Sequence, residues 1–283
     1  MYPREVTSYI IYSSPAGTTR HVAMTIAGTI KEMGSHAHVW DLGNRSDASA
    51  VEKQTQELSK DCCIWIGTPV YAGHAVPSVT SFLSRLPQGN GSYVVPFVTW
   101  GAVTSGVALH EMGTMLSAKG YMLLGAAKIG AVHSMLLQCK NPLGVGHPDA
   151  RDDMMVKNLV EAVSSKIHSG SPQPLSLQQL NYQPGEVQEW LQKANIGAAK
   201  KMLPPLKLIE DKCTRCGICE KECPADAIRL DPYPRFGDAC FMCYNCYRAC
   251  EEQAIACDLS PVEKVLKEKS AQNQELPLTQ IFF

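Results

Sequence analysis

The sequence predicts an α/β domain with a doubly wound parallel sheet, followed by a small cysteine-rich α+β domain. Two observations support this fold class. Apolar strand-like runs alternate with helical patterns over residues 1–168, and eight of the twelve cysteines lie between positions 213 and 250. The composition, with 45% hydrophobic and 19% charged residues, is typical of a globular protein. At 283 residues, the chain has room for one ordinary domain and one small one.

The first part contains five strand-like runs separated by segments of helical character. Ser8–Tyr12 is rich in β-branched and aromatic residues, and the next segment places Val22, Ile26 and Ile30 on one helix face. Cys62–Gly67 is almost entirely apolar, as expected for a strand that is covered on both sides. The other expected strands are His38–Leu42, Tyr93–Thr99 and one within Tyr121–His133, and the clearest further helices are Ser105–Lys119 and Asp149–Ile167. This alternation predicts a parallel sheet with helices on both faces.

Three of the strands end in unusual loops, and ligands of such sheets bind beyond the carboxyl ends of the strands. Ser13–Thr19 supplies hydroxyl groups and a glycine just before a helix, whose free N–H groups and dipole favour a phosphate. Gly67–His74 and Thr99–Ser105 follow the third and fourth strands, and their aromatic and glycine residues suit a flat heterocycle. Neither G-K-[ST] nor G-x-G-x-x-G occurs in the first loop, which excludes a nucleotide-hydrolysing P-loop and a dinucleotide fingerprint.

These three loops, in this order, resemble the phosphate loop and the two ring loops of flavodoxin, over residues 6–168. The resemblance implies a five-stranded sheet in the order 2-1-3-4-5 and one bound flavin mononucleotide (FMN). The FMN phosphate is then expected on Ser13, Ser14, Ala16, Gly17, Thr18 and Thr19. The isoalloxazine ring is expected between Pro69, Val70, Tyr71, Ala72 and Gly73 on one side and Thr99, Trp100, Gly101 and Ala102 on the other. Stacking of Tyr71 or Trp100 on the ring and a flavin contact of His74 are hypotheses, because such loop residues are also common as ordinary surface residues.

The cysteine-rich part contains one spacing twice. The pattern C-x2-C-x2-C-x3-C is formed by Cys213, Cys216, Cys219 and Cys223, and again 27 positions later by Cys240, Cys243, Cys246 and Cys250. Ala227-Ile228 and Ala254-Ile255 repeat at the same offset, which indicates two halves related by a pseudo-twofold axis. This spacing is the known sequence form of a 4Fe-4S site. The alternatives are zinc, which usually takes two separated C-x2-C pairs, and disulfides, which belong to small secreted domains.

Leu206–Asp258 resembles a bacterial ferredoxin with two 4Fe-4S clusters. The resemblance implies that the fourth cysteine of each run binds the cluster of the other run. One cluster is then expected on Cys213, Cys216, Cys219 and Cys250, and the other on Cys240, Cys243, Cys246 and Cys223. Glu251 stands where the second run usually has proline, a change that removes no ligand. Because such a short segment buries little apolar surface, its folding is expected to depend on the clusters.

Two segments lie outside these domains. Ser169–Pro174 is a change in composition that marks the start of a linker over residues 169–205. Within the linker, Glu186–Met202 is expected to form one helix that buries Trp190 and braces the two domains. The tail, residues 259–283, is expected to begin as a helix and end extended, covering a domain surface or a partner.

The whole chain resembles the flavodoxin–ferredoxin fusion proteins of anaerobic bacteria and archaea. Since a flavin holds two electrons and each cluster carries one, the resemblance implies an electron-transfer protein that exchanges electrons with a redox partner protein. An alternative is an FMN-dependent reductase of a small molecule or metal centre such as a corrinoid, with a substrate pocket between Gly67–His74 and Gly101–Ser105. A redox sensor is a third hypothesis. The sequence contains no evident acid–base dyad, nucleophile or nicotinamide fingerprint that would support hydride chemistry on its own. Whether the protein is an enzyme or an electron carrier therefore stays open.

Charge and hydropathy exclude other classes of partner. A net charge of −1 provides no basic excess for nucleic acid, and no apolar run is long enough to span a bilayer. Met1–Glu5 shows no signal-peptide pattern. We therefore expect a cytoplasmic protein in a reducing, low-oxygen interior. Either a single chain or a homodimer would bring the flavin and the clusters together.

Overall fold

The computed structural model describes residues 6–55 and 62–283, so that Met1–Glu5 lies outside the described residues. The first domain is built on a parallel sheet in the order β2-β1-β3-β5-β7. Counted along the chain, these five long strands have the predicted order 2-1-3-4-5, which is the flavodoxin-like order of doubly wound sheets. Their bounds are β1 (Thr7–Tyr12), β2 (Ala37–Asp41), β3 (Cys62–Tyr71), β5 (Tyr93–Trp100) and β7 (Ala126–Gly130), with a short β6 (Met122–Leu123) beside β5.

Helices cover both faces of this sheet because successive strand residues point to opposite sides. On one face, Ile10 of β1 is buried together with Val22 and Ile26, the predicted apolar stripe of α1. On the other face, Ile11 is buried with Val79 of α3 and with α4 residues. The helices are α1 (Thr18–Glu32) and α5 (Ala150–His168) on the first face, and α2 (Arg45–Thr55), α3 (Pro77–Arg85) and α4 (Ala108–Ala118) on the second.

The segment after the third predicted strand differs from the expected loop. Strand β3 continues to Tyr71 and folds back into a hairpin with β4 (His74–Ala75). The two turn residues, Ala72 and Gly73, have φ values of 52° and 86°. Such a two-residue hairpin turn needs positive φ at both positions. The residues expected to form one ring loop are therefore the end of a strand and a tight turn.

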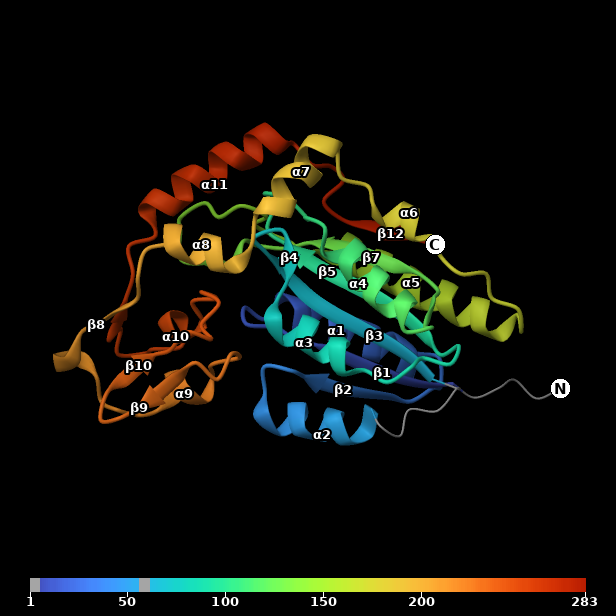
Figure 1. Ribbon diagram of the computed structural model, residues 1–283, viewed down its shortest axis with the longest axis horizontal. Helices are drawn as coiled ribbons and strands as arrows, with labels where there is room; N and C mark the ends of the chain where they lie inside the picture. The colour runs from blue at the N-terminus through green and yellow to red at the C-terminus, as the bar shows by residue number, and fades with distance from the viewer. Residues whose placement is uncertain (1–5, 56–61) are drawn as a thin grey trace.

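The C-terminal tail adds a sixth strand to the long strands. It begins with α11 (Ser260–Asn273) and ends with β12 (Gln280–Phe282), which pairs antiparallel with β7. The expectation of a helix followed by an extended end is met, and the covered surface is the sheet edge of the same chain. Figure 1 shows the tail returning from the cysteine-rich part over α7 and α8 to the sheet. An added strand protects an edge that would otherwise expose unpaired backbone groups.

The linker forms three helices, α6 (Leu177–Leu180), α7 (Gly185–Lys193) and α8 (Ile196–Met202). The single helix expected over Glu186–Met202 is interrupted, because Asn195 is extended and its side chain accepts a hydrogen bond from the backbone of Ala198, capping a new helix. The prediction that Trp190 is buried was also wrong. This side chain is 43% exposed, whereas its neighbour Leu191 is fully buried.

The cysteine-rich part is small and internally repeated. Its two-stranded sheets are β9 with β10 and β8 with β11. Positive φ occurs at Arg215, Gly217 and Asp226, and again 27 positions later at the residues equivalent to them, Met242, Tyr244 and Gln253. The backbone thus repeats with the sequence. The elements are β8 (Lys207–Leu208), α9 (Ile218–Lys221), β9 (Ile228–Leu230), β10 (Pro234–Phe236), α10 (Asn245–Arg248) and β11 (Ile255–Ala256).

Within residues 6–55 and 62–283, no helix combines the length and hydrophobicity that crossing a membrane requires.

Candidate redox site

The structure brings the eight predicted cluster ligands together in two sets. We call Cys213, Cys216, Cys219 and Cys250 the outer cysteine site; all four line one small cavity of about 110 Å³. We call Cys223, Cys240, Cys243 and Cys246 the inner cysteine site. Burial raises the pKa of the Cys243 and Cys246 thiols to about 12, and the nearby Cys223 and Cys240 add a smaller effect in the same direction.

Backbone N–H groups point at sulfur in both sites. Ala227 donates to Cys223 Sγ at 3.3 Å, and its repeat equivalent Ala254 donates to Cys250 Sγ at 3.2 Å. These are the fourth cysteines of the two runs, and in the inner site Met242 N–H also donates to Cys240 Sγ at 3.5 Å. Hydrogen bonds to cluster-binding sulfur stabilise added negative charge and are a means of tuning a cluster potential.

The inner site lies against the flavodoxin-like domain. Phe241, between two inner-site cysteines, is buried in the same apolar cluster as the β3 and α3 side chains. Its ring contacts the Tyr71 ring edge-on, with centroids 5.9 Å apart. Arg248 of α10 donates to the carbonyl oxygen of Pro15 at 2.9 Å. The inner site therefore touches both the predicted phosphate loop and the first predicted ring segment.

The predicted phosphate loop leads into the N-terminus of α1. Gly17 caps the helix with φ 88°, and no acidic residue lies in the first turn. Several hydroxyl groups of the loop are engaged within the protein. Ser14 Oγ accepts from the backbone of Arg20 at 2.9 Å, and Thr19 Oγ1 lies 2.8 Å from Thr99 Oγ1. The helix N-terminus and its dipole remain the main feature that favours a phosphate here.

The two predicted ring segments are packed against other parts of the chain. Gly73 contacts the linker so closely that a Cβ there would lie 2.1 Å from Leu191 Cδ2. The Trp100 side chain is 2% exposed and donates through Nε1 to the carbonyl oxygen of Leu278 in the tail. Stacking of the Trp100 ring on a flavin stays a hypothesis. Tyr71 packs on Phe241, as described above.

His74 is a structural anchor in this arrangement. Its Nδ1 lies 2.7 Å from Glu111 Oε1, and its Nε2 donates to the carbonyl oxygens of Leu191 at 3.1 Å and Ala194 at 2.8 Å. The hydrogen bond with Glu111 is the main cause that raises the pKa of His74. The side chain thus fixes the end of α7, and a flavin contact of His74 finds no support in this geometry.

The tail also places the carboxylate of Glu275 against the second predicted ring segment. Glu275 accepts from the Ser105 backbone at 2.9 Å and forms a 2.7 Å ion pair with Lys128, which is itself buried. Burial alone would raise the pKa of Glu275, but hydrogen bonds from Gln183, Lys128 and Ser105 hold that pKa below its usual value. Glu275 therefore stays ionised and closes this part of the sheet edge.

One buried polar atom near the carboxyl edge, His133 Nδ1, has no hydrogen-bond partner among the described residues. His133 follows β7 and packs on Gly101, where a Cβ would lie 2.6 Å from His133 Cα. Burial lowers the pKa of His133 to about 4, so the ring is neutral. Unpaired buried polar atoms are rare and indicate a missing partner. The N-terminus of α1 fits a phosphate, and His133 Nδ1 fits a polar partner on a bound group.

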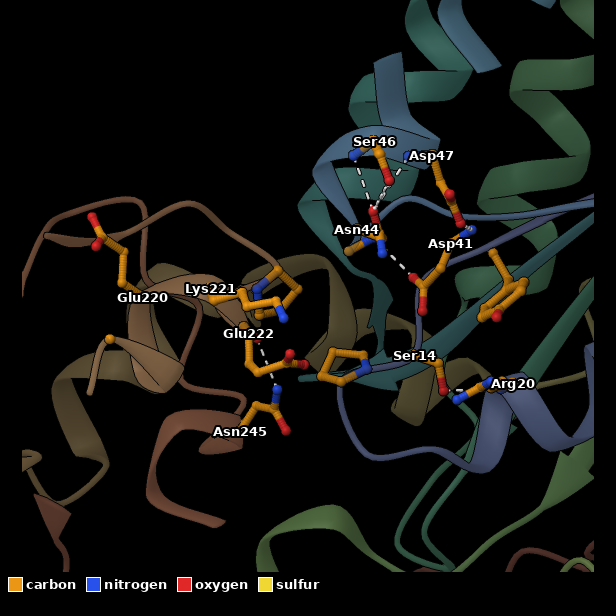
Figure 2. Close-up of a pocket in the computed structure, with 15 residues that line it drawn as sticks. Ser14, Arg20, Asp41, Asn44, Ser46, Asp47, Glu220, Lys221, Glu222 and Asn245 are labelled. Carbon is orange, nitrogen blue, oxygen red and sulfur yellow. Dashed lines mark hydrogen bonds between the residues drawn. The ribbon is translucent and has the colours of Figure 1, made fainter. Parts of the chain in front are cut away.

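A separate cleft of about 700 Å³ lies between the two domains (Figure 2). Among the residues expected to hold the flavin, only Ser14 lines it. The lining carboxylates are those of Asp41, Asp47, Glu220 and Glu222, against the cations of Arg20 and Lys221. Because negative groups are in excess, this cleft disfavours a phosphate. Burial raises the pKa of Asp41, the carboxylate beside the phosphate loop.

Sequence reasoning missed the residues that join the parts of the chain. Phe241 and Arg248 are hidden between cysteines, where the spacing of the ligands dominates the pattern. Glu275 lies in a polar stretch of the tail without any motif. His133 was assigned no role, although its place after a strand was a usable signal.

Known proteins of two kinds are similar to parts of this chain. Residues 206–229 match the family described as 4Fe-4S binding domain. Among solved structures, a flavodoxin from the domain Archaea has 16% identity and a TM-score of 0.44, covering 57% of this chain and 99% of that one. The two-electron reduced flavodoxin of Megasphaera elsdenii has 20% identity and a TM-score of 0.40, covering 56% and 98%. The rubredoxin oxygen:oxidoreductase of the anaerobe Desulfovibrio gigas has 16% identity and a TM-score of 0.44, covering 58% and 36%. The fold assignment itself rests on the strand order.

Proposed function

We propose that this chain, a flavodoxin-like domain joined to a 4Fe-4S binding domain, is an electron-transfer protein that carries FMN and two 4Fe-4S clusters. The clusters occupy the outer and inner cysteine sites, and FMN lies at the carboxyl edge of the sheet with its phosphate at the N-terminus of α1. Electrons pass between FMN and the clusters and are exchanged with a redox partner protein. The observation that carries the proposal is the packing of the inner site on the predicted flavin segments through Phe241 and Arg248.

The two kinds of cofactor supply complementary chemistry, since flavin exchanges electrons in pairs and each cluster exchanges one. The residues of the chain position them and set their surroundings. Gly17 and the first turn of α1 receive the phosphate. His133 offers an unpaired polar atom. Ala227 and Ala254 stabilise added negative charge at the sulfurs of Cys223 and Cys250.

The positions of the two cysteine sites suggest an order for the electrons. Cys216 of the outer site is exposed, whereas Cys223 and Cys246 of the inner site are buried. A partner protein therefore approaches the outer cluster most closely, and the inner cluster lies between it and the flavin. In this proposal the outer cluster, the inner cluster and the flavin all belong to one chain. Electron transfer between them therefore does not need a second copy of the protein.

The reductase hypothesis loses its proposed substrate pocket. Leu191 covers the turn at Gly73, and Glu275 fills the segment at Ser105. With the flavin at these segments, Leu191 and Glu275 would restrict the access of a second small molecule. We therefore favour a protein as the electron donor or acceptor.

An acceptor screen under anaerobic conditions tests this function. Purified protein is reduced with dithionite, the excess reductant is removed, and reoxidation is followed with protein acceptors and with small molecules that include a corrinoid. We expect rapid single-electron reoxidation by a redox protein and no saturable turnover of a small molecule. Saturation kinetics with a small acceptor would contradict the proposal in favour of a reductase.

A further inference from the structure

Arg248 joins three segments that are far apart in the sequence. Its Nη2 donates to the Pro15 carbonyl oxygen at 2.9 Å, in the predicted phosphate loop. Its Nη1 donates to the carbonyl oxygens of Cys243 at 3.0 Å and of Ser134 at 3.2 Å. Cys243 belongs to the inner site, and Ser134 begins a short 3-10 turn that follows β7. One guanidinium thus holds the inner site against two loops of the flavodoxin-like domain.

The charge of Arg248 has no carboxylate partner within salt-bridge distance among the residues that the structure describes. The guanidinium is partly buried, and its bonds go to neutral carbonyl groups. A partly buried cation of this kind is stabilised by nearby negative charge. The inner-site sulfurs are the negative groups that cluster binding would place beside it, since Arg248 Nη1 bonds the carbonyl oxygen of the inner-site residue Cys243.

We propose that Arg248 is the positioning residue of the flavin–cluster junction. Its guanidinium N–H donors fix the inner site beside the phosphate loop. Its positive charge stabilises the reduced form of the inner cluster. This inference rests on the proposed function, because it assigns a role within the same junction. The transfer itself moves one electron: the inner cluster is oxidised as the flavin is reduced, with no bond made or broken at Arg248.

The internal repeat provides a matched control. The residue 27 positions before Arg248 is Lys221, which is exposed at the rim of the cleft. Solvent and salt screen an exposed ammonium group, so its removal has little effect on either cluster. Arg248→Gln removes both the positive charge and the guanidinium donors, whereas Arg248→Lys keeps the charge but not the donor geometry. Lys221→Gln removes a positive charge at the equivalent position of the repeat.

The variants are compared as intact, anaerobically purified proteins by two measurements. Redox titration followed by electron paramagnetic resonance gives the potentials of the clusters. Flash reduction gives the rate of electron exchange between flavin and cluster. In Arg248→Gln we expect one cluster potential to become more negative while the other is unchanged. The rate of electron exchange between flavin and cluster should fall by about tenfold or more. A factor of this size corresponds to the free energy of one hydrogen bond to a charged group. Arg248→Lys should restore the potential but not the rate, and Lys221→Gln should match wild type.

Limited proteolysis of the linker adds a readout that needs no cofactor signal, and we expect faster cleavage in Arg248→Gln than in Lys221→Gln. Wild-type potentials and rate in Arg248→Gln, or equal changes in Lys221→Gln, would overturn the inference. Wild-type protein without clusters or flavin would instead refute the proposed function, and proteolysis would still decide whether Arg248 holds the domains together.

Discussion

The two cysteine sites share one spacing and one backbone pattern but lie in different surroundings. The outer site is close to solvent, with Cys216 exposed. The inner site is packed on the flavodoxin-like domain by Phe241, whose repeat equivalent in the outer run is the exposed Thr214. The difference shows that the repeat specifies how sulfur is held, whereas the residues between the cysteines decide what each site contacts. An asymmetric relay can therefore arise from a symmetric duplication.

The largest expected effect comes from removing one ligand of each site. Cys243→Ala and Cys213→Ala should each lower the iron content by about half, since each removes one of two clusters. Electron exchange with the flavin should disappear in Cys243→Ala and persist in Cys213→Ala, because the inner site packs on the flavodoxin-like domain through Phe241 and Arg248. Iron analysis and flash reduction measure these changes. Flavin should stay bound in both variants, and its loss would show that the two domains are not independent.

A smaller effect is expected from the aromatic contact. Phe241→Ala should lower the free energy of unfolding by about 3–5 kcal/mol, the usual cost of truncating a buried phenylalanine. The equivalent Thr214→Ala should change it by less than about 0.5 kcal/mol, since Thr214 is exposed. Urea unfolding of the anaerobic protein measures both values. Equal losses would mean that Phe241 is not the contact that distinguishes the inner site.

Chelation should separate the two clusters by their access to solvent. With an excess of an iron chelator, we expect iron to leave in two phases, with the faster phase from the outer site. Cys213→Ala should lack the fast phase and keep the slow one. A single phase in wild type, or a remaining fast phase in this variant, would contradict the assignment of inner and outer sites.

The smallest effect concerns pH and the linker that leads to the inner site. His74 bonds the end of α7, and Tyr244 Oη donates to Pro204 at the end of the linker. Because the folded pKa of His74 is raised, its contribution to stability is fully present below the unfolded pKa of about 6.5 and is lost as pH rises through the folded pKa. Unfolding measured on both sides of this range should show the decline.

Glu111→Gln is the control for this pH effect. The hydrogen bond with Glu111 is the largest cause of the raised pKa, so the variant should lose most of the pH dependence in this range. An unchanged pH profile would show that another group is responsible.

The parallel strands could be predicted from alternating apolar runs, and the order 2-1-3-4-5 followed from the resemblance to flavodoxin. The duplicated spacing singled out the eight cysteines, whose role as cluster ligands stays a prediction. The tail strand could not be predicted, since Gln280–Phe282 is short and depends on the free edge of β7. The hairpin at Ala72 and Gly73 was missed because Thr68 and Pro69 suggested the end of a strand, although β3 continues through both.

The orientations of side chains in the candidate site also could not be predicted from the sequence. Trp100 ends a strand at the predicted edge, and its indole N–H donates to the carbonyl oxygen of Leu278 in the tail. Trp190 and Leu191 are adjacent on one helix, and the close approach of Gly73 selects Leu191 for burial. Such choices depend on contacts between segments that are distant in the sequence.

One determination tests the central idea most directly: iron, sulfide, zinc and flavin content of native protein isolated without oxygen. Two cubane clusters beside a single flavin require about eight iron atoms, an equal amount of sulfide and one FMN per chain. Zinc in place of iron, or cysteines free of metal in a folded chain that binds no flavin, would contradict the account.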